Sequence, residues 1–191
     1  MTLILKKADP NIYDFVYSDM KKQFPESELK DYDVFINLLN KIDYELLLAK
    51  INNSTVGYVI VAKDNINKVI WLDYIAILQD FHSKGYGSLI ISNLKKYYPD
   101  YNGCYLEVEK PDLTCNNTLR RIKFYKNLGA EKLNIDYYYP NKDGMLPMDL
   151  YFISYNNFSP NRLFSQSVIN NIFMLLHKNI IHYQEVLSKI K

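Results

Sequence analysis

Two glycines separated by one residue, Gly85 and Gly87, form the part of the sequence whose spacing best indicates a chemical role. They follow an apolar stretch, 68–77, that reads as a buried strand, and they precede a segment, 89–97, with helical apolar spacing. A glycine turn between a strand and a helix leaves backbone N–H groups pointing outward at the positive end of the helix dipole. Because glycine has no Cβ, a phosphate can approach the main chain closely there. The sequence therefore predicts a site for a pyrophosphate-bearing ligand.

Two common phosphate-binding loops do not fit this spacing. A Walker loop needs its lysine after the last glycine, whereas Lys84 precedes Gly85. The dinucleotide-binding fingerprint needs a third glycine three residues after the second, where this chain has Ile90. The pattern His82-x-x-Gly85-x-Gly87 instead resembles the Gln/Arg-x-x-Gly-x-Gly/Ala loop of the GCN5-related N-acetyltransferase (GNAT) superfamily, which binds the pyrophosphate of coenzyme A. His82 departs from the pattern, because the family usually has Gln or Arg there.

A second match to the same family lies downstream, in residues 118–130. Tyr125 and Gly129 fit the family's Phe-Tyr-x-x-x-Gly-Phe/Ala helix, and an Asn-Asn pair that ends at Asn117 fits the loop before it. The two motifs occur in the family's order with a predicted strand between them, which is much more specific than either motif alone. The resemblance covers roughly residues 2–155.

The resemblance implies acetyl-CoA as the cosubstrate and indicates which residues would contact it. In GNAT enzymes a backbone N–H of the strand before the phosphate loop donates to the acetyl carbonyl. Tyr125 is expected to protonate the departing sulfur, since a phenol with a pKa near 10 holds its proton at neutral pH. The competing interpretation is that Tyr125 is a packed residue, one of 18 tyrosines. The residues expected at the cofactor are Ile75, Ala76, Ile77, His82, Ser83, Lys84, Gly85, Tyr86, Gly87, Ser88, Asn117 and Tyr125.

Four carboxylates are candidates for the general base that takes the proton of the amine. Asp73 lies in an otherwise apolar strand, where a carboxylate needs either a chemical role or a bond to a neighbouring group. Glu107 and Glu109 are alternatives that share one face of the predicted strand 104–109. Glu28 ends a Phe-Pro-x-x-Glu stretch that resembles one found in some GNAT proteins, in the region where acceptors bind. Some GNAT enzymes use water instead of a side chain, so that route stays open.

These residues predict an acetyl-CoA-dependent N-acyltransferase that moves an acetyl group to a primary amine by direct attack in a ternary complex. The acidic candidates would suit a cationic acceptor, either a small molecule or a peptide. The alternative is a GNAT-fold acyl-CoA-binding regulatory or interaction module without transferase activity, which the long apolar tail favours. Acetylation of Cys104 or Cys115 during turnover would contradict direct attack.

Composition argues against several other functions. A net charge of +2 over 191 residues gives no strong case for binding nucleic acid or an anionic membrane. Two cysteines are too few for a disulfide framework, and no histidine lies at metal-ligand spacing from them, so no metal is expected. The N-terminus has no signal-peptide pattern, and no apolar run of about 18 residues could span a membrane. A cytoplasmic protein is therefore expected.

The alternation of strands and helices predicts an α/β fold with a mixed, mostly antiparallel sheet flanked by helices, as in GNAT proteins. Residues 1–155 are predicted to form the acetyltransferase domain, and 156–191 a C-terminal amphipathic helical extension that packs on it or mediates a homodimer. The apolar positions expected to be buried include Phe15, Leu89 and Leu163. The predicted strands are 3–6, 44–50, 56–62, 68–77, 104–109, 131–138 and 149–155; the predicted helices before the tail are 12–20, 34–39, 89–97 and 119–127.

Overall fold

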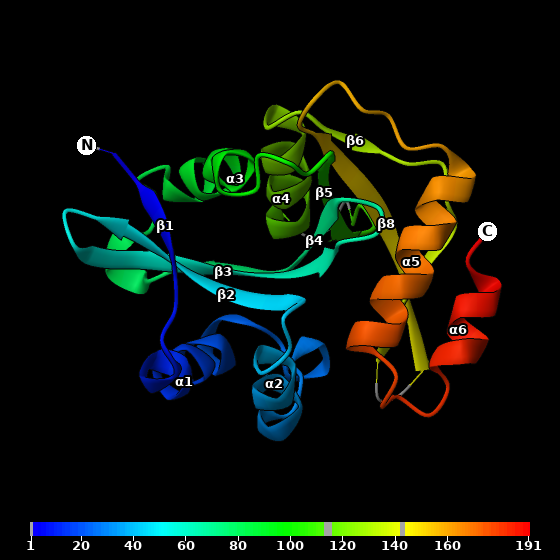
Figure 1. Cartoon of the computed structure of the whole chain (residues 1–191), viewed down its shortest axis with the longest axis horizontal. Coiled ribbons are helices and arrows are strands. Elements are labelled where there is room, and N and C mark those ends of the chain that lie inside the picture. The colour runs from blue at the N-terminus through cyan, green and yellow to red at the C-terminus, as the bar shows by residue number, and fades with distance from the viewer. Residues whose placement is uncertain (1, 113–115, 142–143) are drawn as a thin grey trace. The chain divides into compact units, whose positions relative to one another are not determined.

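A computed structural model describes residues 2–112, 116–141 and 144–191, and it contains an eight-stranded sheet flanked by helices (Figure 1). The strands are β1 (Ile4–Lys7), β2 (Tyr44–Ile51), β3 (Ser54–Asp64), β4 (Val69–Ile77), β5 (Gly103–Glu109), β6 (Ala130–Lys132), β7 (Tyr137–Asn141) and β8 (Gly144–Ser154). The longer helices are α1 (Tyr13–Gln23), α2 (Tyr32–Leu39), α3 (Tyr86–Tyr97), α4 (Asn116–Asn127), α5 (Arg162–Leu176) and α6 (Tyr183–Lys189). Short 3-10 helices are η1 (Pro10–Ile12), η2 (Glu26–Glu28) and η3 (Gln79–Phe81).

The strand order is β1-β2-β3-β4-β5-β8-β6, and β7 pairs with β8. The predicted fold class, a mixed α/β fold with a sheet flanked by helices, is confirmed. The chain forms two compact units, which are described separately below. The first unit comprises Met1–Val61 with Leu72–Pro99, and the second comprises Ala62–Trp71 with Asp100–Lys191.

The first unit begins with an antiparallel pair of strands. β1 pairs with β2, with Ile4 opposite Lys50. The turn after β2 contains Asn52 and Asn53, whose φ angles are 48° and 66°. Asparagine tolerates this left-handed conformation better than most residues, which explains why the hairpin turns at this point.

Two helices, α1 and α2, cover one face of β2 and β3 in the first unit (Figure 1). α1 ends before Pro25, because Phe24 precedes a proline and has an extended conformation with φ −117° and ψ 145°. Val16 and Met20 of α1 are buried. The expectation for Phe15 is wrong, since this residue is 51% exposed. Consecutive helical residues point about 100° apart, so Phe15 turns away from the face that Val16 buries.

α3 covers the other face of the same strands (Figure 1). Its buried residues are Ile90, Ile91 and Leu94. The expectation for Leu89 is wrong, since this residue is 40% exposed. The helix buries two consecutive isoleucines, which shifts its inward stripe away from Leu89.

In the second unit, the three strands β5, β6 and β7 each pair with β8. β5 pairs with it antiparallel along its whole length, from Gly103 opposite Ser154 to Glu109 opposite Met148. The single strand predicted at 131–138 is wrong, because the chain there forms two separate strands, β6 and β7, that each pair with β8. The residues of 131–138 have no clear apolar alternation, so the sequence does not indicate the break between β6 and β7.

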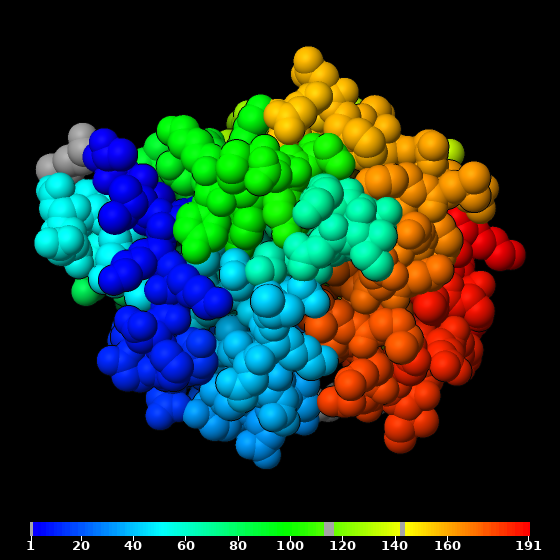
Figure 2. Space-filling view, viewed as in Figure 1, coloured from blue at the N-terminus to red at the C-terminus, as the bar shows by residue number. Residues whose placement is uncertain are grey.

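The C-terminal tail packs within the second unit. The hydroxyl of Tyr105 on β5 lies 2.9 Å from Oγ of Ser165 on α5. Nδ2 of Asn171, also on α5, donates to Oδ2 of Asp64 at 2.9 Å. Figure 2 shows α5 (orange) and α6 (red) in contact along the surface. The expectation for Leu163 is wrong, since it is 83% exposed in the first turn of α5. Use of the tail in a homodimer stays a prediction.

Candidate functional site

The predicted phosphate loop connects β4 to α3 in the first unit. Ser83 and Gly85 have positive φ angles of 61° and 76°, and Gly85 is the N-cap of α3. Its cap position has no side-chain hydrogen bond, and the first turn of α3 contains no acidic residue. The first amides of a helix lack intrahelical partners, so those at 86–88 form the positive end of a 12-residue helix. This geometry is favourable for an anion.

Two side chains of the loop bind the loop's own backbone. Nε2 of His82 lies 2.7 Å from the carbonyl oxygen of Ile77, and because a carbonyl only accepts, this nitrogen carries a proton. Nζ of Lys84 donates to the carbonyl oxygen of Asp80 at 3.0 Å and lies 5.2 Å from the ring centre of Phe81. His82 and Lys84 therefore stabilise the turn through hydrogen bonds to its backbone. Their contact with a phosphate stays a prediction.

The end of β4 is held by two neighbouring elements of the first unit. Nε2 of Gln23, the last residue of α1, donates to the carbonyl oxygen of Ile77 at 3.1 Å. On β3, a Cβ added to Gly57 would lie 2.4 Å from the carbonyl oxygen of Ala76, so only glycine permits this close approach. Ala76 is buried, while Ile75 and Ile77 are partly exposed. The main chain that is predicted to hold the acetyl carbonyl is therefore fixed in position.

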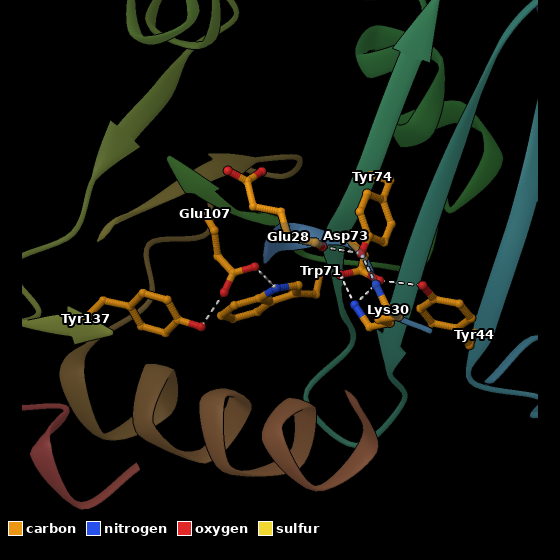
Figure 3. A network of polar contacts seen from close by, with 8 residues as sticks. All are labelled: Glu28, Lys30, Tyr44, Trp71, Asp73, Tyr74, Glu107 and Tyr137. Carbon is orange, nitrogen blue, oxygen red and sulfur yellow. Dashed lines mark hydrogen bonds and ion pairs between the residues drawn. The ribbon is translucent and has the colours of Figure 1, made fainter. Parts of the chain in front are cut away.

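Asp73 on β4 forms an ion pair with Lys30 (Figure 3). Nζ of Lys30 donates to both carboxylate oxygens at 2.8 Å, and the two side chains are only 7% (Lys30) and 3% (Asp73) exposed. The hydroxyl of Tyr44 on β2 donates to the same carboxylate. The ammonium of Lys30 also lies 4.9 Å from the ring centre of Tyr74. Both oxygens of Asp73 are thus bonded inside the first unit.

Glu107 on β5 belongs to a second network, inside the second unit (Figure 3). Nε1 of Trp71 donates to its Oε2 at 3.2 Å, and the hydroxyl of Tyr137 donates to its Oε1. Trp71 is stacked on Tyr105 with ring centres 5.6 Å apart. Trp71 and Tyr137 are buried, and Glu107 is partly exposed. Rigid aromatic donors therefore orient this carboxylate.

Tyr125 lies on α4 and is buried. Burial raises the pKa of its phenol to about 12, although the nearby Arg121 acts in the opposite direction. The group therefore keeps its proton at neutral pH, as a general acid requires. Arg121 donates to Oε2 of Glu109 at 2.8 Å. Asn117 is exposed in the first turn of α4, whereas Cys115 lies outside the described residues.

Glu28 is the last residue of η2, in the segment between α1 and α2. Its carbonyl oxygen accepts a hydrogen bond of 2.7 Å from the hydroxyl of Tyr74. Its carboxylate extends away from Lys30 and Asp73 (Figure 3). The structure thus brings Glu28 and Asp73 into one network of the first unit, and it places Glu107 in a network of its own.

Sequence reasoning missed the partners of two carboxylates, which are Lys30 and Tyr44 for Asp73 and Trp71 and Tyr137 for Glu107. A buried Asp in an apolar strand signals that some partner exists. It does not identify Lys30, which lies 43 positions away in the sequence. Tyrosines are so frequent in this chain that none could be selected by its type.

Residues 2–112, 116–141 and 144–191 contain no group of three or more His, Cys, Asp and Glu side chains that could hold a metal ion. They also contain no helix that is both long enough and apolar enough to cross a membrane.

Known proteins resemble the chain in sequence profile and in fold. The profile of the Acetyltransferase (GNAT) family matches residues 11–130, more than half of the chain. A solved structure from Bacteroides thetaiotaomicron, assigned to the GNAT family, matches with a TM-score of 0.77 and 19% identity over 91% of this chain and 98% of its own. The ribosomal-protein-S18-alanine N-acetyltransferase of Escherichia coli matches with a TM-score of 0.61 and 17% identity over 84% of this chain and 98% of its own.

A third similar structure is the spermidine N-acetyltransferase of Vibrio cholerae in complex with CoA and spermine. Its TM-score is 0.59, with 15% identity over 80% of this chain and 95% of its own. At such identities the structural likeness shows the fold alone. No curated protein sequence matches the chain.

Proposed function

The chain belongs to the GNAT family of acetyltransferases, and we propose that it transfers an acetyl group from acetyl-CoA to a primary amine by direct attack in a ternary complex. The observation that carries the proposal is the glycine turn at Gly85, which is the N-cap of α3 in the loop that follows β4 and has no side-chain cap hydrogen bond. Such a turn supports binding of the coenzyme A pyrophosphate.

Residues of the first unit would bind acetyl-CoA, the acetyl donor. Backbone N–H groups at 83–88 bind the pyrophosphate, and the main chain of 75–77 donates to the acetyl oxygen as it gains negative charge. The nitrogen of the amine forms a bond to the acetyl carbon while the bond from that carbon to sulfur breaks. The thiolate then takes the phenolic proton of Tyr125, whose raised pKa of about 12 keeps it protonated until that moment.

The amine must also lose a proton during the reaction, and Glu28, Asp73 and Glu107 are the candidate acceptors. A general base contributes typically about 10²–10⁴-fold to the rate. The amide variants Glu28→Gln, Asp73→Asn and Glu107→Gln keep the shape of each side chain and remove its basicity. The variant with the largest loss of kcat, together with the loss of the acidic limb of the pH profile, identifies the base. Small losses in all three would point to proton transfer through water.

The acceptor that we propose is a cationic primary amine on a small molecule or a peptide. The similar enzymes named above acetylate an alanine of a ribosomal protein and spermidine, which are both amines. We further propose a cytoplasmic protein that acts without a metal, nucleic acid or membrane as its partner and that forms a homodimer through the tail. Sedimentation of the purified protein tests the dimer.

The direct test is release of coenzyme A thiol from acetyl-CoA in the presence of a panel of amines, with mass spectrometry of the acetylated product. Wild-type protein should produce acetyl-amine, and Tyr125→Phe should lose turnover while it still binds CoA. A neighbouring substitution on α4, Phe124→Leu, serves as the control for packing. Binding of acetyl-CoA without any transfer would favour the alternative, a regulatory or interaction module. Transient acetylation of Cys104 would contradict direct attack.

A further inference from the structure

The segment 24–31, between α1 and α2, is attached to β4 through one tyrosine, Tyr74. The ring of Phe24 meets the ring of Tyr74 edge to face, with centres 5.1 Å apart. The hydroxyl of Tyr74 donates to the carbonyl oxygen of Glu28 at 2.7 Å and accepts from the backbone N–H of Lys30 at 3.3 Å. Tyr74 therefore contacts the beginning, the middle and the end of the segment.

The ion pair of Lys30 and Asp73 fastens the same segment a second time. Both oxygens of Asp73 accept from Nζ of Lys30 at 2.8 Å, and the hydroxyl of Tyr44 adds a bond to the same carboxylate. The carbonyl oxygen of Lys30 in turn accepts a bond of 2.9 Å from the hydroxyl of Tyr17 on α1. A charge pair this well buried is held only if both partners are present, because either charge alone would be left without compensation.

The location of this attachment connects it with acetyl transfer. Tyr74 directly precedes 75–77, whose main chain is proposed to hold the acetyl oxygen. The segment fixed on Tyr74 also contains Glu28, one of the candidate proton acceptors. The contacts that fix the segment 24–31 therefore also fix the part of the first unit that would surround the acetyl group.

We propose that Lys30, Asp73 and Tyr74 are positioning residues, which together lock the segment 24–31 onto β4 beside the acetyl-holding main chain, and that Asp73 does not serve as the general base. This inference rests on the proposed acetyl transfer for its kinetic consequence. The lock itself is a property of the folded chain. Because Lys30 neutralises Asp73, the carboxylate neither attracts a cationic acceptor nor takes its proton.

The kinetic experiment compares Asp73→Asn, Lys30→Met and the double variant. A lock requires both partners, so the single variants should raise the acceptor KM to a similar extent and lower kcat by less than about tenfold, well below the roughly 10²–10⁴-fold expected for loss of a base. The pH profile of kcat should keep its acidic limb in both. The double variant should be no worse than either single variant, since the two substitutions remove one shared interaction. Lys7→Met removes the ion pair between the exposed Lys7 and Glu45, 3.6 Å apart in the same unit; it is the matched control and should change nothing.

The opposite result is equally clear. If Asp73→Asn abolishes kcat and removes the acidic limb while Lys30→Met leaves kcat intact, Asp73 is the base and the proposal is wrong.

A second experiment is independent of turnover. Amide hydrogen exchange of the peptide containing 24–31 is followed in the free protein, for wild type, Tyr74→Phe and the Asp73→Asn/Lys30→Met double variant. The lock predicts faster exchange in this segment in both variants, with unchanged exchange in α3. Unchanged exchange in the segment would overturn the proposal, whether or not the protein acetylates an amine. If wild type acetylates no amine but the exchange result holds, the failure belongs to the proposed function alone.

Discussion

Two carboxylates that look alike in the sequence are bonded in opposite ways in the two units. Asp73 in the first unit accepts two bonds from a cationic ammonium, that of Lys30. Glu107 in the second unit accepts from two neutral donors, the indole of Trp71 and the phenol of Tyr137. Each lies on a strand whose neighbouring positions are buried.

The difference determines what each carboxylate can do. The ammonium of Lys30 compensates the negative charge of Asp73. Removal of the ammonium would leave the buried carboxylate of Asp73 without a counter-charge. Trp71 and Tyr137 are neutral donors, so they orient Glu107 without adding a positive charge to it, whereas the donor Lys30 brings a full charge to Asp73. Burial and residue type alone therefore do not identify a catalytic acid or base, and the chemical type of the bonding partner must be known.

Removing the cation should have the largest effect on stability. We expect Lys30→Met to lower the free energy of unfolding by about 3–5 kcal/mol, because the buried carboxylate of Asp73 loses its counter-charge. Adding Asp73→Asn to this variant should restore part of the loss, since no lone charge then remains. Urea-induced unfolding measures both. A loss below about 1 kcal/mol, typical of an exposed pair, would show that the ion pair is accessible to water.

High pH should destabilise the second unit through its buried phenol. Tyr125 has a folded pKa of about 12 against an ordinary 10.0, and burial is the main cause. The contribution of Tyr125 to the free energy of unfolding is therefore complete below pH 10.0 and is lost as the pH rises toward 12. Between these values the phenol ionises in the unfolded chain but not in the folded one. The loss is on the order of 3 kcal/mol at about 1.4 kcal/mol per pH unit. Unfolding curves at several alkaline pH values measure it, and Tyr125→Phe should flatten the dependence.

Removing a neutral donor should cost less than removing the cation. Tyr137→Phe takes one hydrogen bond from Glu107 and keeps the ring that packs on Trp71, so we expect a loss of about 2 kcal/mol. Calorimetric or urea unfolding of the variant gives the value. A loss as large as that of Lys30→Met would contradict the comparison, since it would mean that Glu107 depends on this phenol as strongly as Asp73 depends on its lysine.

The sequence was sufficient for the fold because the features that set it are local. Apolar spacing predicts β2, β3, β4 and β5, and the proline after Phe24 predicts the end of α1. Phe15 and Leu89 were misplaced because a helix selects one of several overlapping apolar stripes only when it packs.

The site was harder to predict than the fold. The glycine turn at Gly85 is visible because positive φ favours one residue type. The pairing of Asp73 with Lys30 joins residues from distant parts of the chain, and only the folded arrangement brings them within 2.8 Å. Local spacing thus predicts where a cofactor binds, and tertiary contacts decide which carboxylates remain available for chemistry.

The most direct test of the account is thermal unfolding of the wild-type protein with and without acetyl-CoA, with ATP and NAD as controls. At about 100 times its dissociation constant, a ligand adds roughly 2.7 kcal/mol, which raises the unfolding temperature by several degrees. We expect this rise with acetyl-CoA and none with either control. We also expect the rise to be lost in Gly85→Val, because valine disfavours the positive φ of 76° and its side chain blocks the close approach of a phosphate. No rise with acetyl-CoA would show that the glycine turn serves only the fold, and it would contradict the proposed acetyltransferase.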